Sequence, residues 1–468
     1  MSDATKVIAG LFKLHNINIP AGRMGAFEQF TKQSSNEAAI NAIIENQEIL
    51  MARWSIDNRI AEIMEQPVRV LNATVGKPYE TLLDFKKLKW DDVESFGLLG
   101  LEEVGLHFDE EKGLITGVPT QSGDIKALLK FKIKGQPEEA GINEKPITII
   151  INPDPKSLWK KVESDKNDRF WKEDDLTVFA PLAGRHLLVS SKRGRSHANV
   201  GSFREDDFAF KNLDQGWSII VVADGAGSAK ISRKGSAMAC TEAVEYFMQP
   251  EAIKAMEEFD ELVQHYSNNT GEEIQQKLNR LVYNNLGKAA FHMHKKLEAF
   301  AKQENIPLKD LNSTLIFTCI KKYESGYACL TFGVGDCPIA ILSKDLTEVT
   351  LMNWLDVGEF GGGTRFITMP EIFQNNKFAT RFGFKLVQDF SYLFMMSDGI
   401  YDPKFVVEAN LPKTEKWREF IADIQGNNPE GIKVDLDASN KAITDQFSAW
   451  MDFWSPGNHD DRTLAILF

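Results

Sequence analysis

The sequence predicts an α+β protein in three parts: a helical N-terminal segment, a small β-sandwich, and a larger domain in which buried strands alternate with long helices. Three observations predict this arrangement. Apolar residues recur at helical spacing until Pro67, short strands with glycine and proline turns follow to about residue 153, and continuous apolar runs such as residues 219–222 appear beyond it. The length of 468 residues agrees with about three domains, each large enough to bury a core.

Residues 1–66 form the predicted helical segment. An apolar stripe at helical spacing runs through residues 40–54, and Pro67 should end the helix because proline lacks a backbone donor and clashes with the preceding turn. Such a stripe usually packs against a neighbouring element of the same chain. A partner-binding or dimerising helix is the alternative interpretation.

Residues 67–153 are predicted to form a small β-sandwich. Glycine and proline occupy turn positions between apolar pairs in residues 105–123. This stretch resembles the immunoglobulin-like domains of bacterial proteins, because it carries their Leu-x-Phe-Asp, Gly-x-Ile-x-Gly and Pro-Thr patterns. The resemblance implies an interaction surface at most and no catalytic residue. Residues 154–178, which are proline-flanked and rich in charge, are predicted to link this part to the last domain, residues 179–468.

Acidic residues stand at the strand ends of the last domain. A single Asp-Gly pair is more often a hairpin turn, but several acids that each adjoin a buried strand predict an all-oxygen site for a hard cation such as Mg²⁺ or Mn²⁺. The acids are Asp224 after residues 217–223, Asp336 after residues 327–335, Asp398 after residues 392–397, and Asp460 and Asp461 before residues 463–468.

These acids belong to motifs that follow one another in a characteristic order. The motifs are Asp224-Gly-Ala-Gly-Ser228, Asn312-Ser-Thr314, Gly335-Asp336, Ser397-Asp398-Gly399 and Asp460-Asp461-Arg-Thr463, preceded by Ser196-His197, Gly201 and Arg204-Glu-Asp-Asp-Phe208. In this order they resemble the metal-dependent protein phosphatases, type 2C. The segment from Ser196 to Phe208 resembles the opening motif of the bacterial branch. The resemblance covers residues 165–468. It implies a type 2C phosphatase-like fold, a β-sandwich of two sheets flanked by helices.

The resemblance implies a site for two divalent cations, Mg²⁺ or Mn²⁺. Asp224 would contact both cations, with the carbonyl oxygen of Gly225 as a further ligand. Asp206 would take the early acidic position. Asp398 and Asp460 would complete the site.

Two further acids have less defined roles. Glu205 is included among the metal ligands because a shift of one residue in the motif would exchange its role with that of a neighbouring acid. Asp336, together with Asp398, can hold a third and weaker metal, and a plain turn is the alternative for Asp336.

The residue that positions the phosphate is the least defined part of the predicted site. The family's better-known members carry an arginine a few residues before the first metal aspartate, where this chain has Gly201. Arg195 is the candidate replacement, because a guanidinium can grip phosphate with two parallel hydrogen bonds. His197 is the alternative, as a phosphate donor or as the proton source for the leaving alkoxide. Some relatives have a histidine where this chain has Ala226, so general acid catalysis from that position is not expected.

The function that follows is hydrolysis of phosphoserine or phosphothreonine in proteins by a water or hydroxide that bridges two divalent cations. One alternative is a catalytically silent phosphoprotein-binding scaffold, a pseudophosphatase. Another is a hydrolase of small phosphate esters. The expected partners are a phosphorylated protein substrate and, by resemblance to bacterial relatives, a cognate serine/threonine kinase.

Composition limits the location and the partners. The net charge of −13 and the lack of a basic run argue against a nucleic-acid binder. No apolar run is long enough to cross a membrane, and the N-terminus makes a poor signal peptide, so we expect a cytoplasmic protein without a membrane partner. The four cysteines match no zinc pattern and are predicted to be buried thiols.

Overall fold

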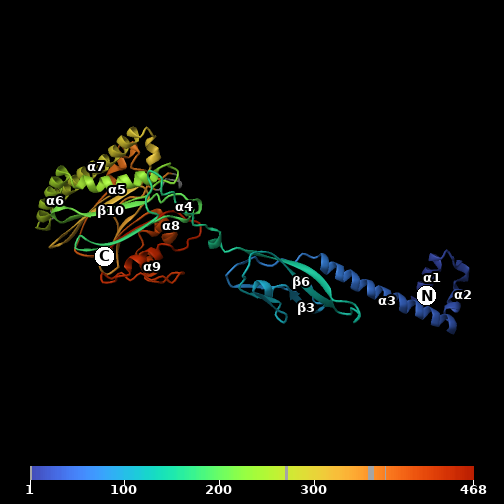
Figure 1. Ribbon diagram of the computed structural model, residues 1–468. Helices are drawn as coiled ribbons and strands as arrows, with labels where there is room; N and C mark the ends of the chain where they lie inside the picture. Colours follow the sequence, from blue (N-terminus) through green and yellow to red (C-terminus); the bar gives the residue numbers. More distant parts are fainter. Residues whose placement is uncertain (1–2, 269–271, 357–362, 375) are drawn as a thin grey trace. The chain divides into compact units, whose positions relative to one another are not determined.

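The computed structural model describes residues 3–268, 272–356, 363–374 and 376–468 (Figure 1). The chain divides into two compact units, Met1–Leu158 and Trp159–Phe468. Within the described residues, no helix combines the length and the apolar character that crossing a lipid bilayer would require.

The first unit begins with three helices, which confirms the predicted helical segment. They are α1 (Asp3–Leu14), α2 (Met24–Thr31) and α3 (Ser34–Glu65). α1 and α2 pack on the first turns of α3 around Ile8, Phe27 and Ile40. α3 ends two residues before Pro67, because the residue preceding a proline is pushed out of the helical region.

Two sheets complete the first unit as a small β-sandwich, as predicted. One sheet has the strand order β1-β7-β6-β3 and the other β2-β5-β4. Alternate residues of the strands point inward, and Ile63 of α3 is fully buried in the same core. The immunoglobulin-like assignment stays a prediction. The strands are β1 (Ala73–Thr74), β2 (Tyr79–Leu82), β3 (Val93–Leu99), β4 (Leu106–Asp109), β5 (Leu114–Gly117), β6 (Gly123–Ile133) and β7 (Asn143–Asn152).

The second unit is built on two larger, mainly antiparallel sheets. The five-stranded sheet has the order β10-β11-β12-β13-β16, and the six-stranded sheet has the order β15-β14-β17-β18-β9-β8. The strands are β8 (Asp175–Leu182), β9 (Arg185–Lys192), β10 (Asp207–Asn212), β11 (Trp217–Ala223), β12 (Leu315–Tyr323), β13 (Gly326–Val334), β14 (Ile339–Ser343), β15 (Val349–Leu351), β16 (Phe382–Val387), β17 (Phe390–Met396) and β18 (Arg462–Leu467).

Helices cover the outer face of each sheet (Figure 1). α5, α6 and α7 pack on the five-stranded sheet, and α8, α9 and α10 on the six-stranded sheet. A third apolar cluster lies between the two sheets. The predicted β-sandwich flanked by helices is therefore confirmed. The helices are α4 (Arg195–Val200), α5 (Ser232–Phe247), α6 (Pro250–Asn268), α7 (Glu272–Gln303), α8 (Asp398–Phe405), α9 (Thr414–Ile424) and α10 (Ile443–Trp450).

The segment predicted as a linker, 154–178, differs from that prediction over most of its length. The second unit begins at Trp159, and β8 already starts at Asp175. Ser164 is buried and donates to the Asp174 carboxylate at 2.7 Å, while Arg193 forms an ion pair with Asp174 at 3.0 Å. One of the charges that make the segment resemble a linker, that of Asp174, is used in these internal contacts.

The antiparallel register gathers the predicted acids at one end of the sandwich. β11 ends beside the start of β10, with Ala223 opposite Asp207, and beside the start of β12. In the other sheet, β17 ends where β18 begins, with Met396 opposite Leu464. The strand ends that carry acids therefore meet, although the acids are far apart in sequence.

Gly235 and Gly287 give a matched test of helix packing in the second unit. A Cβ at Gly235 in α5 would overlap the carbonyl group of Leu311, so Gly235→Ala should lower the free energy of unfolding by about 2 kcal/mol. A Cβ at Gly287 in α7 would make ordinary contacts with Phe378 at 3.5 Å and Phe382 at 3.7 Å. Gly287→Ala should therefore stabilise the chain by about 0.5–1 kcal/mol, because alanine is the better helix former. Calorimetric unfolding of both variants measures the two opposite shifts, and a Gly235→Ala chain as stable as the parent would contradict this packing.

Candidate metal centre

Asp224 lies at the end of β11, where two hydrogen bonds hold its backbone in place. Its amide donates to Thr314 Oγ1 at 2.9 Å, and the Thr314 amide donates to the Asp224 carbonyl at 2.8 Å. The motif Asn312-Ser-Thr314 therefore acts as a clamp that holds the Asp224 carboxylate at the end of the sheet.

Two glycines let the segments of the site approach one another. A Cβ at Gly225 would lie 2.6 Å from the Glu205 carbonyl oxygen and 3.0 Å from Ser232 Cβ, and a Cβ at Gly399 would overlap the Asp461 carbonyl. A side chain at either position would push these segments apart. The Asp-Gly motifs are needed here for close approach, because neither glycine has a positive φ.

Asp206, which is buried, and Asp224 and Asp398, which are half-buried, form a group of carboxylates that repel one another. Burial, followed by the charge of Asp461, raises the pKa of Asp206 to about 7, even though Ser397 and Thr463 donate hydrogen bonds to it. Burial also raises the pKa of Asp224 well above its usual value, and the charges of Asp206 and Asp398 add to that shift. The same two causes raise the pKa of Asp398, where Asp336 is the first of the neighbouring charges.

Glu205 carries the observation that best fits a cation. Its Oε2 is buried and accepts no hydrogen bond from the residues that the structure describes, and His197 Nε2 lies 3.8 Å away. Burial raises the pKa of Glu205 to about 7. A buried carboxylate oxygen without a hydrogen-bond donor is costly, and the ion pair with His197, which is longer than a hydrogen bond, offsets that cost only in part. Because the group consists of carboxylates, the donor set suits a hard divalent cation.

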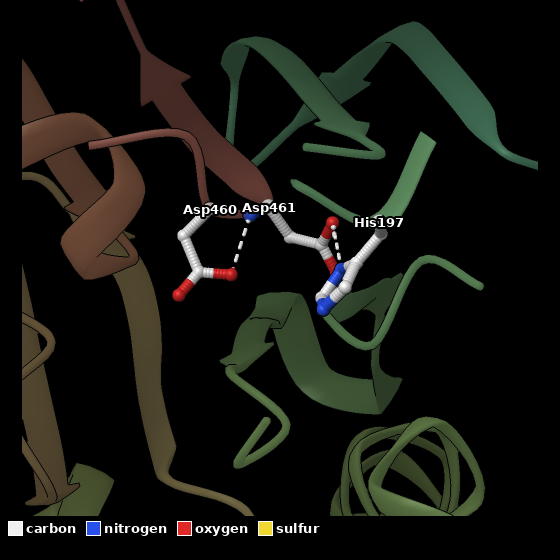
Figure 2. A group of neighbouring side chains, drawn as sticks. All are labelled: His197, Asp460 and Asp461. Atoms are coloured by element: carbon white, nitrogen blue, oxygen red, sulfur yellow. Dashed lines mark hydrogen bonds and ion pairs between the residues drawn. The ribbon is translucent and has the colours of Figure 1, made fainter. Parts of the chain in front are cut away.

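Asp460 and Asp461 turn to different sides of the chain (Figure 2). The Asp460 carboxylate accepts a hydrogen bond from the Asp461 amide at 2.8 Å. The Asp461 carboxylate accepts from His197 Nδ1 at 2.9 Å, from the Gly194 amide at 2.6 Å and from the Glu205 amide. Asp460 is exposed, with a carboxylate oxygen within 4.8 Å of ligand atoms of His197 and Asp461, while Asp461 joins three segments of the chain.

His197 and Asp461 stabilise each other's charged forms. Burial alone would lower the pKa of His197, but the hydrogen bond and the charge of Asp461 outweigh it and raise this pKa to about 9. Burial alone would raise the pKa of Asp461, and the hydrogen bond from His197 outweighs it, so this pKa is lowered. His197 is therefore an imidazolium near neutral pH.

Asp336 lies beside Asp224 at the end of β13. Ligand atoms of Asp224, Asp336 and Cys337 all lie within 4.8 Å of one another. Burial raises the pKa of Cys337 well above its usual value, so the protonated thiol is a poor ligand and the two carboxylates remain as candidates. Thr364 Oγ1 donates to Asp336 Oδ2 at 2.7 Å. All four cysteines are free and buried, as predicted.

Arg195 does not occupy the phosphate-gripping position predicted from the sequence. Its guanidinium donates to the Phe453 carbonyl at 2.8 Å and to the Asp452 carbonyl at 2.6 Å, and it also forms an ion pair with the Asp452 carboxylate at 3.0 Å. Its planar face lies over the ring of Trp454. Arg195 therefore anchors the segment that leads to Asp460.

Lys172 is a residue of the site that the sequence did not reveal. Its Nζ donates to the Asp206 carbonyl at 2.7 Å and to Asp207 Oδ2 at 3.0 Å. The Asp207 carboxylate is thereby neutralised away from the metal centre, while Asp206 faces it. No spacing rule links Lys172 to this motif, because the contact depends on how the segment before β8 folds back over α5.

The fold and the acidic site define a class of protein: a two-sheet sandwich whose strand ends hold carboxylates for divalent cations. A family model described as "Protein phosphatase 2C" matches residues 193–437, which is just over half of the chain. The chain belongs to the protein phosphatase 2C family, whose members use divalent metals. The resemblance predicted from the motifs is confirmed for this domain.

Solved structures of bacterial phosphatases are among those similar to the chain. The crystal structure of a bacterial serine phosphatase has 14% sequence identity and a TM-score of 0.33, and the match covers 60% of this chain and 96% of that one. The serine/threonine phosphatase Stp1 from Staphylococcus aureus has 14% identity and a TM-score of 0.34, with coverages of 62% and 96%. The S. agalactiae serine/threonine phosphatase has 14% identity and a TM-score of 0.33, with coverages of 63% and 99%. No curated protein sequence matches the chain.

Lys172→Met tests whether Lys172 holds the acidic motif in place. The variant leaves the Asp207 carboxylate without its cation, so the free energy of unfolding should fall by about 3 kcal/mol. Affinity for Mn²⁺ should also fall, because the Asp206 backbone loses a donor. Urea unfolding and calorimetric Mn²⁺ titration measure the two effects. Lys160→Met, at an exposed position of the same segment, should change neither quantity, and unaltered Mn²⁺ affinity in Lys172→Met would contradict the positioning role.

Glu205→Gln tests the unfavourable ionisation of the centre. The pKa of Glu205 is raised in the folded chain to about 7 from an unfolded value of 4.5, so stability is lost as pH rises through that window. Glutamine cannot ionise. In EDTA, the variant should gain stability over the parent as pH rises from about 5 to 7, by on the order of 2 kcal/mol.

Urea unfolding at a series of pH values measures this difference. Glu163→Gln, at an exposed carboxylate, is the control and should show little change. A Glu205→Gln difference that is independent of pH would contradict the unfavourable environment of this carboxylate.

Proposed function

We propose that the chain is a serine/threonine protein phosphatase that depends on Mg²⁺ or Mn²⁺ and hydrolyses phosphoserine or phosphothreonine. The observation that carries the proposal is the buried Glu205 Oε2 without a hydrogen-bond donor, beside aspartates whose pKa values burial and mutual repulsion raise. Such a group is unfavourable alone and favourable around cations. Family membership supports the phosphatase chemistry.

The ligands of the proposed cations come from the ends of several strands. Asp224, the Gly225 carbonyl, Asp398 and Asp460 would hold two cations, together with the early acids Glu205 and Asp206. Asp336 and Asp398 would hold a third. When bound, the cations neutralise the phosphate dianion and lower the pKa of water, so that hydroxide is available near neutral pH.

The two early acids, Glu205 and Asp206, have different proposed roles. Within the described residues Glu205 Oε2 accepts no hydrogen bond and forms a long ion pair with His197 at 3.8 Å, so it is the better candidate for direct contact with a cation. Asp206 is hydrogen-bonded by Thr463 Oγ1 at 2.8 Å and is almost completely buried, so it orients the motif and supplies negative charge. The motif alone does not distinguish the role of Glu205 from that of a neighbouring acid, and this assignment gives the contact with a cation to Glu205.

His197 is the proposed contact for the substrate phosphate. Its Nδ1 is held by Asp461, which leaves Nε2 directed toward the acidic centre near Glu205. As an imidazolium it can donate a charge-assisted hydrogen bond to a phosphate oxygen. Ala226 has no proton to give, and both terminal nitrogens of Arg195 donate to the Asp452 and Phe453 carbonyl oxygens. The predicted cytoplasmic location and the predicted kinase partner stay predictions.

Asp224→Asn tests the function directly. With Mn²⁺ and a phosphothreonine peptide, phosphate release should fall by about a hundredfold or more, because the variant removes the negative charge of a residue that would hold the cations. EDTA should abolish release by the parent chain. Asp214→Asn, at an exposed aspartate just before β11, should retain full activity.

Two further measurements separate the alternatives. Rates on p-nitrophenyl phosphate, compared with rates on the peptide, distinguish a small-ester hydrolase from a protein phosphatase. Calorimetric Mn²⁺ binding without turnover of either substrate would contradict the proposal and favour the silent scaffold.

A further inference from the structure

The middle of α3 is a bare apolar helix. Every residue from 45 to 55 is exposed. This stretch nevertheless carries Leu50, which is 66% exposed, Trp54, which is 70% exposed, and the exposed Ile49 and Met51. A helix gains most of its stability from packing one face, so a bare segment with large apolar side chains indicates a missing partner.

A groove lies between α1 and the first half of α3, and it reaches into the exposed stretch as far as Leu50. It has a volume of about 780 Å³. At Gly10 a Cβ would meet nothing within 4 Å, so the groove is open there. Its lining is Lys6, Val7, Gly10, Leu11, Leu14, Ala42, Ile43, Asn46, Gln47 and Leu50.

The groove and the bare segment follow one another on the same helix. Thr5 of α1 lies against Thr31, just before α3 begins, with their hydroxyls 3.3 Å apart. Leu14 at the other end of α1 lines the groove together with Leu50. Ile43, Leu50 and Trp54 lie on one face of α3, because helical residues at such spacings share a face. The apolar face is therefore flanked by α1 before Leu50 and loses that flank after it.

We propose that this surface binds a second copy of the chain, with the two α3 helices antiparallel and a two-fold axis at Leu50. A two-fold axis at Leu50 places the exposed second half of each α3 in the groove of the other copy. The exposed apolar side chains are then covered and both grooves are filled. Trp54 then lies at the level of Asn46 and Gly10 of the second copy, where the groove has room. The amide oxygen of Asn46 can accept the indole N–H, which needs a partner when it is buried.

Charge favours the antiparallel arrangement. Residues 34–48 of α3 contain Glu37, Glu45 and Glu48 and no basic residue, whereas residues 49–55 contain Arg53 and no acidic residue. The antiparallel pair places the acidic half of each helix beside the half of the second copy that contains Arg53. A parallel pair would align the acidic halves, and the same acidic half disfavours an anionic lipid surface.

The apolar area is sufficient for a small stable interface. Leu14, Ile43, Leu50, Met51 and Trp54 together expose on the order of 600 Å² per copy, which is at the lower end of the area that specific interfaces bury on each partner. Contacts of α3 with the β-sandwich are made by Ile56, Ile60 and Ile63, which lie on a different side of the helix from Trp54.

Sedimentation equilibrium of the full chain tests the proposal. The mass should be twice 52.7 kDa, and Leu50→Glu and Trp54→Glu should each reduce it to 52.7 kDa. Ala52→Glu places the same charge at an exposed position on the opposite face and should leave the dimer intact. A monomeric parent chain, or a dimer that survives Leu50→Glu, would overturn the proposal.

Cysteine cross-linking tests the direction of the helices, with little background because the four native cysteines are buried. Oxidised Leu50→Cys should form a covalent dimer, whereas Ile43→Cys should not, because the two copies of that residue lie far apart in the antiparallel pair. Ala52→Cys is the control on the outer face and should stay monomeric in denaturant. A covalent dimer through Ile43→Cys would indicate parallel helices and overturn the arrangement.

Discussion

Electrostatic repulsion is the main constraint on the second unit, because several carboxylates lie close together at a partly buried edge of its two sheets. Burial and the neighbouring charges raise the pKa values of Asp206, Asp224 and Asp398, so each ionisation weighs against the folded chain until a cation is present. The stability that keeps the acids together comes from the apolar clusters on both sides of the two sheets and between them. The rigid sandwich is what allows an unfavourable site to persist.

Close backbone approach is the second requirement of the site. Acids on different strand ends can share a cation only if their segments nearly touch, and Gly225 and Gly399 occur where a Cβ would collide with the segments carrying Glu205 and Asp461. The clamp between Thr314 and Asp224 and the contact between Thr463 and Asp206 then limit movement. The small residues in the motifs are thus explained by the distance between backbones as much as by the turns they make.

The sequence predicted features that depend on local pattern, such as the strands and the acids at their ends. It did not predict the roles of side chains that depend on contacts between distant segments. Buried runs ending in Asp224 and Asp398 predicted strands and a shared edge, and both are present. The roles of Lys172 and Arg195 could not be read in the same way. The first lies in a segment whose composition is typical of a linker, and the second is placed by a segment more than 250 residues away that only the fold brings close. The sequence pattern marks Asp461 only as the neighbour of Asp460 and gives no sign of its hydrogen bond with His197.

Asp461 shows why adjacent acids need not share a role. Hydrogen bonds from His197 and from the Gly194 and Glu205 amides lower its pKa against the effect of burial, whereas the pKa of Glu205 is raised. Asp207, neutralised by Lys172, follows the same logic as Asp461. Asp461 and Asp207 thus hold segments of the chain together, whereas the Glu205 oxygen that accepts no hydrogen bond is left for a cation. Within the run Glu205-Asp206-Asp207 the division follows hydrogen-bond satisfaction, so a one-residue change of register there exchanges a structural acid for a ligand.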